Sequence, residues 1–383
     1  MSDFETRWRE VISGEAGDWW APLARGGLGA LAGLYAGVVG GYRLGFDLRL
    51  LHAASLPCRV VSIGNITVGG TGKTTTTRWL VRRLQEWGRR PAILSHGYRA
   101  GEAAETKQER PPVTVVSDSH QVLAPVETSG DEPQLLARSL PGVPVLIGRK
   151  RVLTARHAYE QLGVDTCVVD DGFQYWRLKK DLEIVLLNAT NPFGYGRLVP
   201  RGMLREPLRG LRRAHAAILT HAARVEPSER DKLRAQIRKL NPHLVLAEAR
   251  HVPVCLREAA TGARLPLESL REGRWLALSS LGSPESFERT LVELGARNPA
   301  PARFRDHHPY RREELAQVVQ QVTREGLSGV VTTEKDFVKI PVEWLAGTDY
   351  RVLEVDLELL SGRDELEALV RTRVGIENGS TAR

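Results

Sequence analysis

The sequence predicts an α/β protein: a mainly parallel sheet flanked by helices, with a second, smaller α/β lobe and an N-terminal membrane-associated helix. Short apolar runs alternate with amphipathic stretches from residue 59 onward, which is typical of strand–helix–strand units. A glycine-rich turn joins the first strand to the first helix, and a Pro-, Gly- and Arg-containing stretch at 191–213 interrupts the alternation. With 383 residues, 42% hydrophobic and 26% charged, the chain is long enough for two domains and is not largely disordered or fibrous.

The N-terminal part is predicted to associate with a membrane. Residues 1–18 form a polar tail with several acidic side chains and no basic region, so a cleavable secretory signal is not expected. Residues 19–50 hold an uncharged, glycine-rich run, Gly26–Tyr42, between Arg25 and Arg43. The run is shorter than the roughly 20 residues that span a bilayer. We therefore expect interfacial anchoring first, a buried helix packed through its glycines second, and a spanning helix third.

The first lobe is expected at 51–215. Its predicted strands are Arg59–Ile63, Pro91–Ser95, Val113–Ser117, Val143–Ile147, Thr166–Val169 and Leu182–Asn188. Its predicted helices are Thr74–Trp87, Glu132–Ser139 and Arg149–Leu162. Residues 101–112 and 191–213 are expected as loops, the second long and basic.

The second lobe is expected at 216–376, after a strand over Ala214–Thr220. The predicted helices are Pro227–Leu240, Pro284–Leu294, Arg311–Glu325 and Arg363–Val374, with strands at Trp275–Leu278, Gly329–Thr332 and Tyr350–Val355. Residues 377–383 are polar and are predicted to be a disordered tail.

Charge and cysteine content limit the possible partners. The net charge is +8, and most of the cations are arginines, which suit phosphate or carboxylate partners, although genomic base composition also explains such a bias. The chain lacks interleaved aromatic and basic residues, so nucleic acid is not an expected partner. Cys58, Cys167 and Cys255 are far apart in sequence and form no CxxC pair. This pattern predicts a reduced protein facing the cytoplasm, without a structural zinc site.

The most informative segment runs from Val60 to Thr74 and predicts nucleotide binding. A β-branched strand enters the loop Thr67, Val68, Gly69, Gly70, Thr71, Gly72, and a helix follows at Lys73 and Thr74. Backbone amides of such a loop and the helix N-terminus can hold phosphate oxygens. Lys73 would reach the β- and γ-phosphates and Thr74 would ligate Mg²⁺. The motif GxxxxGK[ST] requires glycine where this chain has Thr67, but the flanking strand and helix support the interpretation.

Two further segments place acidic residues where a nucleotide site needs them. Asp170 and Asp171 follow an apolar strand and are predicted to hold the metal ion, the alternative being an ordinary turn; the sequence leaves open which carboxylate faces the metal. Asp131, before Glu132, begins a predicted helix. It could cap that helix or act as the base that accepts a proton from a hydroxyl nucleophile, and spacing alone makes the two equal.

The segment Asp306–Tyr310 contains His307 and His308. Two adjacent histidines cannot share a helix face, so one histidine oriented by a carboxylate, in acid–base or phosphate chemistry, is favoured over a two-histidine metal site. The alternative is a loop with hydrogen-bonded histidines. Lys335 and Asp336 end another predicted strand and could approach a nucleotide base.

These motifs together resemble the tetraacyldisaccharide 4′-kinase family. The resemblance rests on VGGTGKT, GDEP, DDGFQ (Asp170–Gln174), PFGYGRLVPRGMLREPL (Pro192–Leu208), DHHPY and TTEKDFVK (Thr332–Lys339), which occur in this order. It implies a P-loop NTPase-like fold and transfer of the γ-phosphate of ATP, with Mg²⁺, to the 4′-hydroxyl of tetraacyldisaccharide 1-phosphate in lipid A biosynthesis. It also implies a lipid-disaccharide substrate at the cytoplasmic face of the inner membrane, and no obligate protein partner.

The resemblance implies roles for individual residues as well. Lys73 and Thr74 match the phosphate and Mg²⁺ residues, Asp170 and Asp171 match acidic residues near the metal, and Asp131 matches the catalytic base with His307 as its partner. The polar residues of the cleft are matched by Glu132, Gln174, Arg205 and Glu206. The chain departs from the family pattern at Thr75, where proline is usual, and at Tyr175 and His96.

One rival interpretation keeps the nucleotide but not the lipid. A P-loop ATPase or GTPase that acts as a switch or metallochaperone would hydrolyse nucleotide without a lipid acceptor. Labelling of a lipid acceptor by the γ-phosphate would separate the two interpretations.

Overall fold

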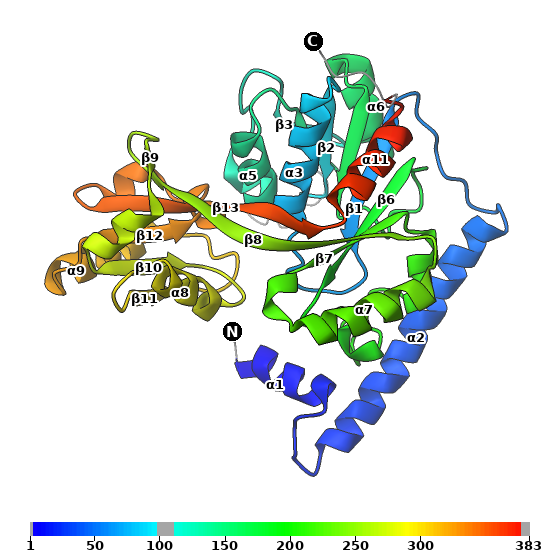
Figure 1. The fold of residues 1–383 in the computed structure, drawn as a ribbon, viewed down its shortest axis with the longest axis horizontal. Coiled ribbons are helices and arrows are strands. Elements are labelled where there is room, and N and C mark those ends of the chain that lie inside the picture. The colour runs from blue at the N-terminus through cyan, green and yellow to red at the C-terminus, as the bar shows by residue number, and fades with distance from the viewer. Residues whose placement is uncertain (1–2, 98–110, 377–383) are drawn as a thin grey trace. The chain divides into compact units, whose positions relative to one another are not determined.

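The computed structural model describes residues 3–97 and 111–376, with side chains from Arg7 onward (Figure 1). The chain divides into two compact units. The larger unit consists of Arg7–His251 and Leu357–Arg383, and the smaller unit of Met1–Thr6 and Val252–Asp356. The predicted boundary near residue 215 does not match this division. Residues 216–251 add two strands and a helix to the first sheet, and the chain returns to the larger unit at Leu357.

The larger unit is built on a mainly parallel sheet with β1 (Arg59–Asn65) between β5 (Thr166–Asp170) and β6 (Leu182–Asn188). The strand order is β8-β7-β6-β1-β5-β2-β4-β3, where β2 is Pro91–Ser95, β3 Thr114–Ser117, β4 Val145–Ile147, β7 Ala216–Thr220 and β8 Val245–Glu258. Only β3 runs antiparallel among the strands of this order that the structure describes. Because β1 and β5 are parallel with Ile63 opposite Asp170, the loops that follow them lie at one edge.

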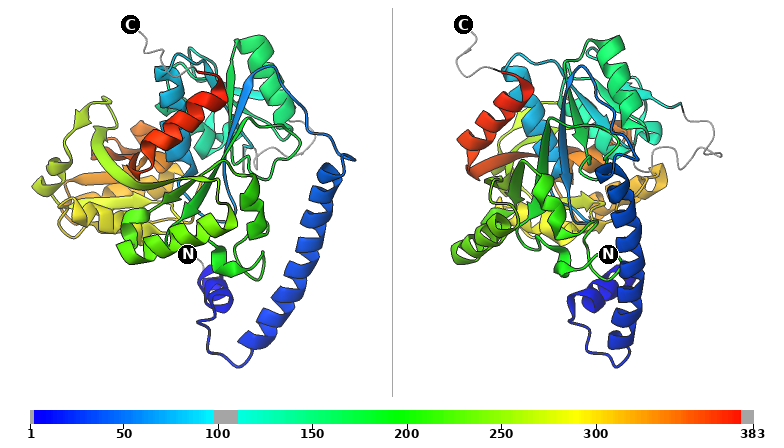
Figure 2. Two further views of the ribbon diagram at one scale, coloured as in Figure 1. Left: turned by 45° about the vertical axis from the view of Figure 1, so that its right-hand side comes forward. Right: turned by 90° about the vertical axis from the view of Figure 1, so that its right-hand side faces the viewer.

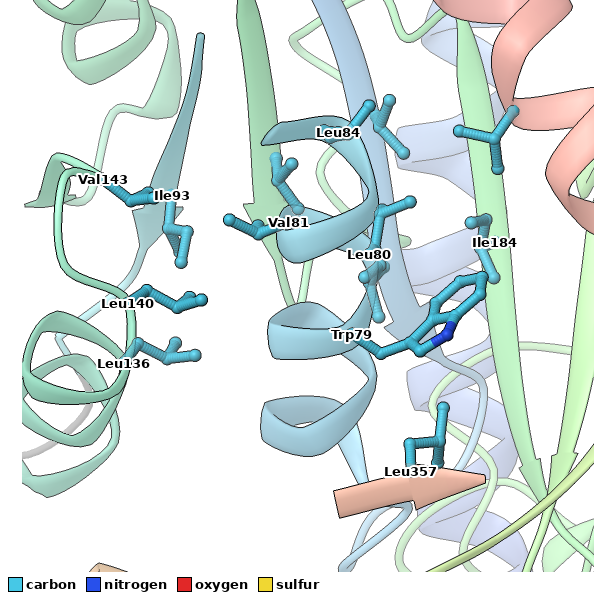
Figure 3. Close-up of a cluster of buried hydrophobic side chains, with 14 of the residues drawn as sticks. Trp79, Leu80, Val81, Leu84, Ile93, Leu136, Leu140, Val143, Ile184 and Leu357 are labelled. Carbon is cyan, nitrogen blue, oxygen red and sulfur yellow. The ribbon is translucent and has the colours of Figure 1, made fainter. Parts of the chain in front are cut away.

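Helices cover both faces of this sheet. Helices α3 (Lys73–Glu86), α5 (Asp131–Ser139) and α11 (Arg363–Val374) pack on one face, and α6 (Arg151–Leu162) and α7 (Pro227–Leu240) on the other. Figure 3 shows Leu80 and Leu84 of α3 pointing into the core beside Ile184 of β6. Burying each such side chain contributes about 1.5–3 kcal/mol. This packing fixes α3, and with it the loop at its N-terminus.

The smaller unit is a second parallel α/β structure. Its sheet has the order β11 (Ala300–Arg303), β10 (Trp275–Ser279), β12 (Gly329–Thr333), β13 (Asp349–Ser361). Helix α9 (Arg312–Arg324) packs on one face and α8 (Pro284–Glu293) on the other. The remaining short elements are α4 (Val126–Ser129), α10 (Glu334–Phe337), β9 (Arg264–Leu265) and 3₁₀ turns at Gly194–Gly196, Leu208–Arg213, Ala222–Arg224, Leu267–Glu272 and Val342–Leu345. The predicted fold class is confirmed.

The N-terminal segment forms two helices. Within the predicted polar tail, α1 covers Asp3–Ser13, and α2 is one unbroken helix over Ala21–Asp47 (Figure 2). A window of α2 has a mean hydropathy of 1.3 and is 6% buried. The interpretation as a buried helix packed through glycines is wrong: a Cβ at any glycine from 26 to 41 would meet no described atom within 4 Å. Length and composition leave both interfacial and spanning placements open.

Sequence patterns located most elements but missed one that matters. The bounds predicted for β2, β6, α7 and α11 agree with the structure. Strand β8 was not predicted, because its 14 residues include arginines, glutamates and a proline instead of a clean apolar run. Strand β8 and the longer-than-predicted β13 are the segments on which the chain passes from one unit to the other. The predicted tail 377–383 and most of the predicted loop 101–112 lie outside the described residues.

Candidate active site

The phosphate loop joins β1 to α3 at the carboxyl edge of the larger unit's sheet. Gly69 (φ 105°) and Gly72 (φ 78°) take left-handed conformations that L side chains rarely adopt. The buried Asn65 amide donates to Thr71 Oγ1 at 3.0 Å, which ties the two ends of the loop together. Lys73 and Thr74 are the first residues of α3, so their positions are those that face an anion at a helix N-terminus.

The basic segment at 191–213 is hydrogen-bonded to the phosphate loop and to the residues just before it. The Val68 amide donates to the Met203 carbonyl at 2.8 Å, and the Arg205 amide donates to the Ile66 carbonyl at 2.7 Å. Thr67 pairs with Leu204 in an antiparallel bridge and is 3% exposed. Thr67 is not among the residues with positive φ, so the turn does not need glycine there. The departure from GxxxxGK[ST] therefore has a structural reason: the loop is held by a strand-like neighbour at this point.

The two strand-end aspartates point into different surroundings. Asp170 is the last residue of β5, and Asp171 follows with a left-handed φ of 51°. Asp171 accepts two hydrogen bonds from one Arg205 nitrogen, at 2.8 and 2.9 Å, and lies 3.9 Å from Lys73 Nζ. Burial alone would raise the pKa of Asp171, but the charges of Lys73 and Arg205 together lower it. Asp171 is therefore an ionised carboxylate that interacts with the side chains of both Arg205 and Lys73, the first residue of α3.

Asp170 is 3% exposed, and a single long hydrogen bond among the described residues offsets little of the cost of burying its charge. Thr77 donates to its Oδ1 at 3.5 Å, a long bond. Burial, followed by the charge of Glu132, raises the pKa of Asp170 to about 7, even though Lys73 acts in the opposite direction. No group of three or more His, Cys, Asp or Glu among residues 3–97 and 111–376 could hold a metal ion. A hydroxyl and one or two carboxylates beside a phosphate loop nevertheless fit Mg²⁺, which takes its other ligands from phosphate and water.

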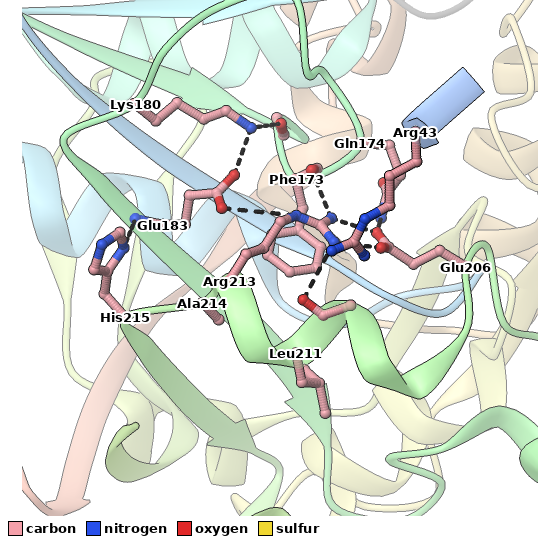
Figure 4. Close-up of polar contacts among 12 residues, drawn as sticks. Arg43, Phe173, Gln174, Lys180, Glu183, Glu206, Leu211, Arg213, Ala214 and His215 are labelled. Atoms are coloured by element: carbon pink, nitrogen blue, oxygen red, sulfur yellow. Dashed lines mark hydrogen bonds and ion pairs between the residues drawn. The ribbon is translucent and has the colours of Figure 1, made fainter. Parts of the chain in front are cut away.

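Gln174 and Glu206, both predicted as cleft residues, belong to a buried polar network (Figure 4). The Gln174 amide nitrogen donates to the Asn65 carbonyl at 2.9 Å and to Glu206 at 2.7 Å. Glu206 is 1% exposed and accepts hydrogen bonds from both terminal nitrogens of Arg213. Arg213 also stacks 3.7 Å from the centre of the Phe173 ring. In this structure Glu206 braces Gln174 and, through it, the end of β1.

Asp131 makes the contact expected of a residue that starts a helix. It is the first residue of α5 after Gly130, it is 8% exposed, and its Oδ1 accepts from the Glu132 amide at 3.0 Å. The charge of Glu132 acts on Asp170, so this helix start faces the same edge as the aspartates. The local capping contact and a role as base are compatible, since each carboxylate oxygen can accept more than one hydrogen bond.

The histidine cluster lies in the smaller unit. His307 (φ 59°) has its Nε2 3.0 Å from Lys335 Nζ, which donates to Asp306 at 3.2 Å. His308 hydrogen-bonds Glu314 at 2.9 Å and stacks on Phe304. The two neighbouring histidines therefore do different things: His308 holds the loop to α9, and His307 is joined to a lysine and an aspartate.

Asp336 does not approach a nucleotide base, and that prediction is wrong. Its side chain is fully buried, and Ser280, Tyr310 and Thr333 donate hydrogen bonds to it while Lys339 lies 2.9 Å away. Burial would raise its pKa, but Lys339 and the Ser280 hydrogen bonds lower it. The adjacent Lys335 is the residue of this motif that reaches the histidine loop.

Sequence reasoning missed several residues that shape the site. The sequence indicates Arg213 only as part of a basic loop, and it does not indicate Glu314 or His251 at all. Glu314 could have been found from its place at the start of a predicted helix, six residues after His308. His251 carries no local signal, because its partner Thr75 is distant in sequence, and Arg213 reaches the equally distant Phe173 carbonyl as well as the nearby Glu206.

The chain is similar to known kinases over most of its length. A model of the family described as LpxK, tetraacyldisaccharide-1-P 4′-kinase, matches residues 25–375. The tetraacyldisaccharide 4′-kinase of Anaeromyxobacter dehalogenans (strain 2CP-C) is 46% identical over 325 residues, 84% of each chain. That of Syntrophus aciditrophicus (strain SB) is 40% identical over 79% of this chain and 80% of its own. The crystal structure of LpxK from Aquifex aeolicus in complex with ATP matches with a TM-score of 0.72 at 27% identity, covering 92% of this chain and 99% of that chain.

Proposed function

Because the chain belongs to the tetraacyldisaccharide-1-P 4′-kinase family, we propose that it transfers the γ-phosphate of ATP to the 4′-hydroxyl of tetraacyldisaccharide 1-phosphate. The observation that carries the proposal is the convergence of the phosphate loop, Lys73, Arg205 and the two strand-end aspartates at one edge of the sheet. The similarity to a structure described in complex with ATP supports ATP as the phosphate donor.

The residues of this edge divide the chemistry of phosphoryl transfer among them. The loop amides and Lys73 stabilise negative charge on the phosphate oxygens, and Arg205 with Asp171 keeps Lys73 oriented. Thr74, Asp170 and Asp171 would hold Mg²⁺, which when bound neutralises charge on the β- and γ-phosphates. Glu132, whose charge acts on the buried Asp170, would contact the lipid-disaccharide substrate at the same edge.

We assign Asp131 the role of general base, and the family resemblance gives His307 a part in the same proton transfer. The assignment of Asp131 is supported by its burial and by the position of its helix at the edge that bears Asp170. A carboxylate there accepts the proton of the attacking hydroxyl. Asp131→Asn should lower kcat about 10²-fold and leave the KM for ATP within about twofold. Asp231→Asn, an exposed aspartate on α7, is the matched control.

The substrate is an amphiphile, and we propose that α2 brings the enzyme to the cytoplasmic face of the inner membrane. Its exposed side chains include Leu23, Leu34 and Val38, each at least 70% exposed. From neighbouring positions on the helix, Tyr35 donates to the Arg205 carbonyl at 2.8 Å, and Tyr42 accepts from Arg177 at 3.0 Å. These contacts tie α2 to the catalytic unit, while its exposed apolar side chains can enter lipid.

The kinase proposal is tested by transfer of radiolabelled γ-phosphate from ATP to a tetraacyldisaccharide 1-phosphate in mixed micelles. Lys73→Ala should reduce transfer by at least about 10³-fold, because the ammonium group stabilises the migrating phosphoryl. Lys232→Ala, an exposed lysine on α7, is the control and should transfer at the rate of the unmodified protein. Hydrolysis of ATP without lipid labelling in the unmodified protein would favour the rival switch or metallochaperone, and full activity of Lys73→Ala would refute the proposed site.

The membrane proposal has a separate test. Leu34→Asp with Val38→Asp should reduce sedimentation with vesicles of anionic phospholipid, because two charges on the lipid-facing side must leave the apolar layer. Val292→Asp, an exposed valine on α8, is the matched control and should sediment as before. Equal binding of both variants would show that α2 does not mediate membrane association.

A further inference from the structure

A histidine outside the predicted site contacts the end of the phosphate loop and the first turn of α3. His251 is on β8, and its Nε2 is 2.8 Å from the Thr75 hydroxyl on the first turn of α3. The Thr75 hydroxyl in turn donates to the Gly72 carbonyl at 2.9 Å. The three residues form a continuous chain of contacts from the sheet to the last residue of the loop.

The ring of His251 reaches Thr75 through one nitrogen. Thr75 Oγ1 and His251 Nε2 share a hydrogen bond at 2.8 Å, and the tautomer of the ring decides which of the two donates. The other ring nitrogen, Nδ1, is shut off from solvent without a hydrogen-bond partner among the described residues. Burial, followed by the charges of His221 and Arg224, lowers the pKa of His251 to about 3, so the ring stays neutral.

The imidazole also fills the space beside Gly72. A Cβ built on Gly72 would lie 2.6 Å from His251 Nε2, so the ring edge occupies the position that a side chain would take. Gly72 is left-handed (φ 78°), and its carbonyl accepts three bonds: from the Thr75 and Thr76 hydroxyls, each at 2.9 Å, and from the Thr76 amide at 3.1 Å. The turn that aims the N-terminus of α3 at a phosphate is thus held on both the carbonyl side and the Cα side.

We propose that His251 is a positioning residue for the nucleotide: through Thr75 it holds Gly72 in the conformation that presents the loop and the first amides of α3 to the phosphates. The inference rests on the proposed nucleotide site. It assigns to His251 no contact with the nucleotide or with the lipid. Its effect is on how well the loop is formed before the nucleotide arrives, so it concerns ATP and not the acceptor.

The test uses four variants of the full chain. His251→Leu approximates the volume but cannot hydrogen-bond, and His251→Gln has an amide group that can donate or accept in place of Nε2. The other two are Thr75→Val and the double variant Thr75→Val/His251→Leu. Affinity for the fluorescent nucleotide mant-ATP with Mg²⁺ is measured first, without lipid. KM and kcat for ATP and KM for the lipid acceptor are measured next. Thermal melting of each variant shows whether it is folded.

We expect His251→Leu to weaken mant-ATP binding and to raise the KM for ATP by about 5–10-fold, the loss of about one buried hydrogen bond. The KM for the lipid should stay constant, and His251→Gln should recover binding to within about twofold. Since Thr75 and His251 act as one unit, the double variant should be no worse than either single variant.

Three results would overturn the inference: ATP parameters unchanged in His251→Leu, losses that multiply in the double variant, or equal losses for ATP and lipid that follow the melting temperature in both His251 variants. The failure of the proposed function looks different. If the unmodified protein binds mant-ATP but labels no disaccharide, the kinase proposal falls, and the dependence of nucleotide binding on His251 is still measured.

Discussion

Two carboxylates that follow parallel strands, Asp171 in the larger unit and Asp336 in the smaller unit, have opposite surroundings. Asp171 keeps 31% of its side chain exposed, and its partners are the guanidinium of Arg205 and the ammonium of Lys73. Asp336 is fully buried and is satisfied by the Ser280 amide, three hydroxyls and Lys339. An aspartate that follows a parallel strand is therefore a group that can meet a ligand in the larger unit, and a structural tie within α10 in the smaller unit.

Following a strand does not by itself decide the function of an aspartate. What decides it is whether the charged groups around the aspartate have hydrogen-bonding capacity that the protein itself does not use. The cations beside Asp171 still have donors to offer, and its neighbour Asp170 is buried with little compensation. Around Asp336 the oxygen atoms are fully used by the protein itself. Nucleotide chemistry needs charge that is available in the free protein, and of the two positions compared the edge with Asp170 and Asp171 provides it.

Removing the structural carboxylate should produce the largest change in stability. Asp336→Ala leaves the Lys339 ammonium and three hydroxyls without their acceptor, and breaking such a buried pair costs about 3–5 kcal/mol of unfolding free energy. Urea denaturation measures the loss. Asp336→Asn, which retains an acceptor oxygen, should lose less than the alanine variant. A change below about 1 kcal/mol in Asp336→Ala would mean that the network is not a structural tie.

Neutralising Asp171 should have the reverse profile. Asp171→Asn removes the anion that aligns Arg205 and Lys73, so kcat should fall about 10²-fold. The unfolding free energy should change by no more than about 1 kcal/mol, because the ion pair is partly exposed. Radiolabel transfer and urea denaturation of the same preparation give both values. A large loss of stability with normal turnover would place Asp171 in the same class as Asp336.

A smaller effect is expected for Arg205→Lys, which tests whether the positive charge of Arg205 suffices or whether the planar guanidinium is needed. Arg205→Lys keeps a cation and leaves the backbone bonds of this residue to Ile66 and Tyr35 in place. It removes the planar guanidinium that donates to both oxygens of Asp171, so we expect about a tenfold decrease in kcat/KM for ATP. Arg197→Lys, in the same basic segment, is the control. Unchanged kcat/KM in Arg205→Lys would mean that charge alone suffices.

Much of the fold was predictable because local rules govern it. The glycine-rich turn between β1 and α3 and the alternation of apolar runs predicted a mainly parallel sheet and most helix bounds. Strand β8 and the division between His251 and Val252 were not predictable in this way. They depend on pairing with β7 and on the return of the chain at Leu357, contacts that leave no periodic signal in the sequence.

The candidate site was predicted in part for the same reason. Lys73, Thr74 and the aspartate pair follow from motifs whose residues are adjacent in sequence. The sequence does not distinguish Asp336 from a site aspartate, because an aspartate that follows a predicted strand looks the same whether its oxygen atoms are free or, as within α10, occupied. The support given by Glu206 and Arg213 to Gln174, and by His251 to Thr75, requires residues that only the fold brings together.

The smallest predicted effect concerns Glu314, the carboxylate that holds His308 beside His307. The His308 hydrogen bond, with help from the Arg311 amide, lowers the pKa of Glu314 to about 2 from an ordinary value of 4.5. A group with a lowered pKa in the folded state stabilises the protein above pH 4.5 and loses that contribution as the pH falls toward 2. The stability difference between the unmodified protein and Glu314→Gln should therefore shrink between pH 5 and 2, as measured by urea denaturation at each pH. Glu313→Gln, an exposed neighbour, controls for the change in net charge. A difference that stays constant over this range would show that the His308 contact does not stabilise the ionised form of Glu314.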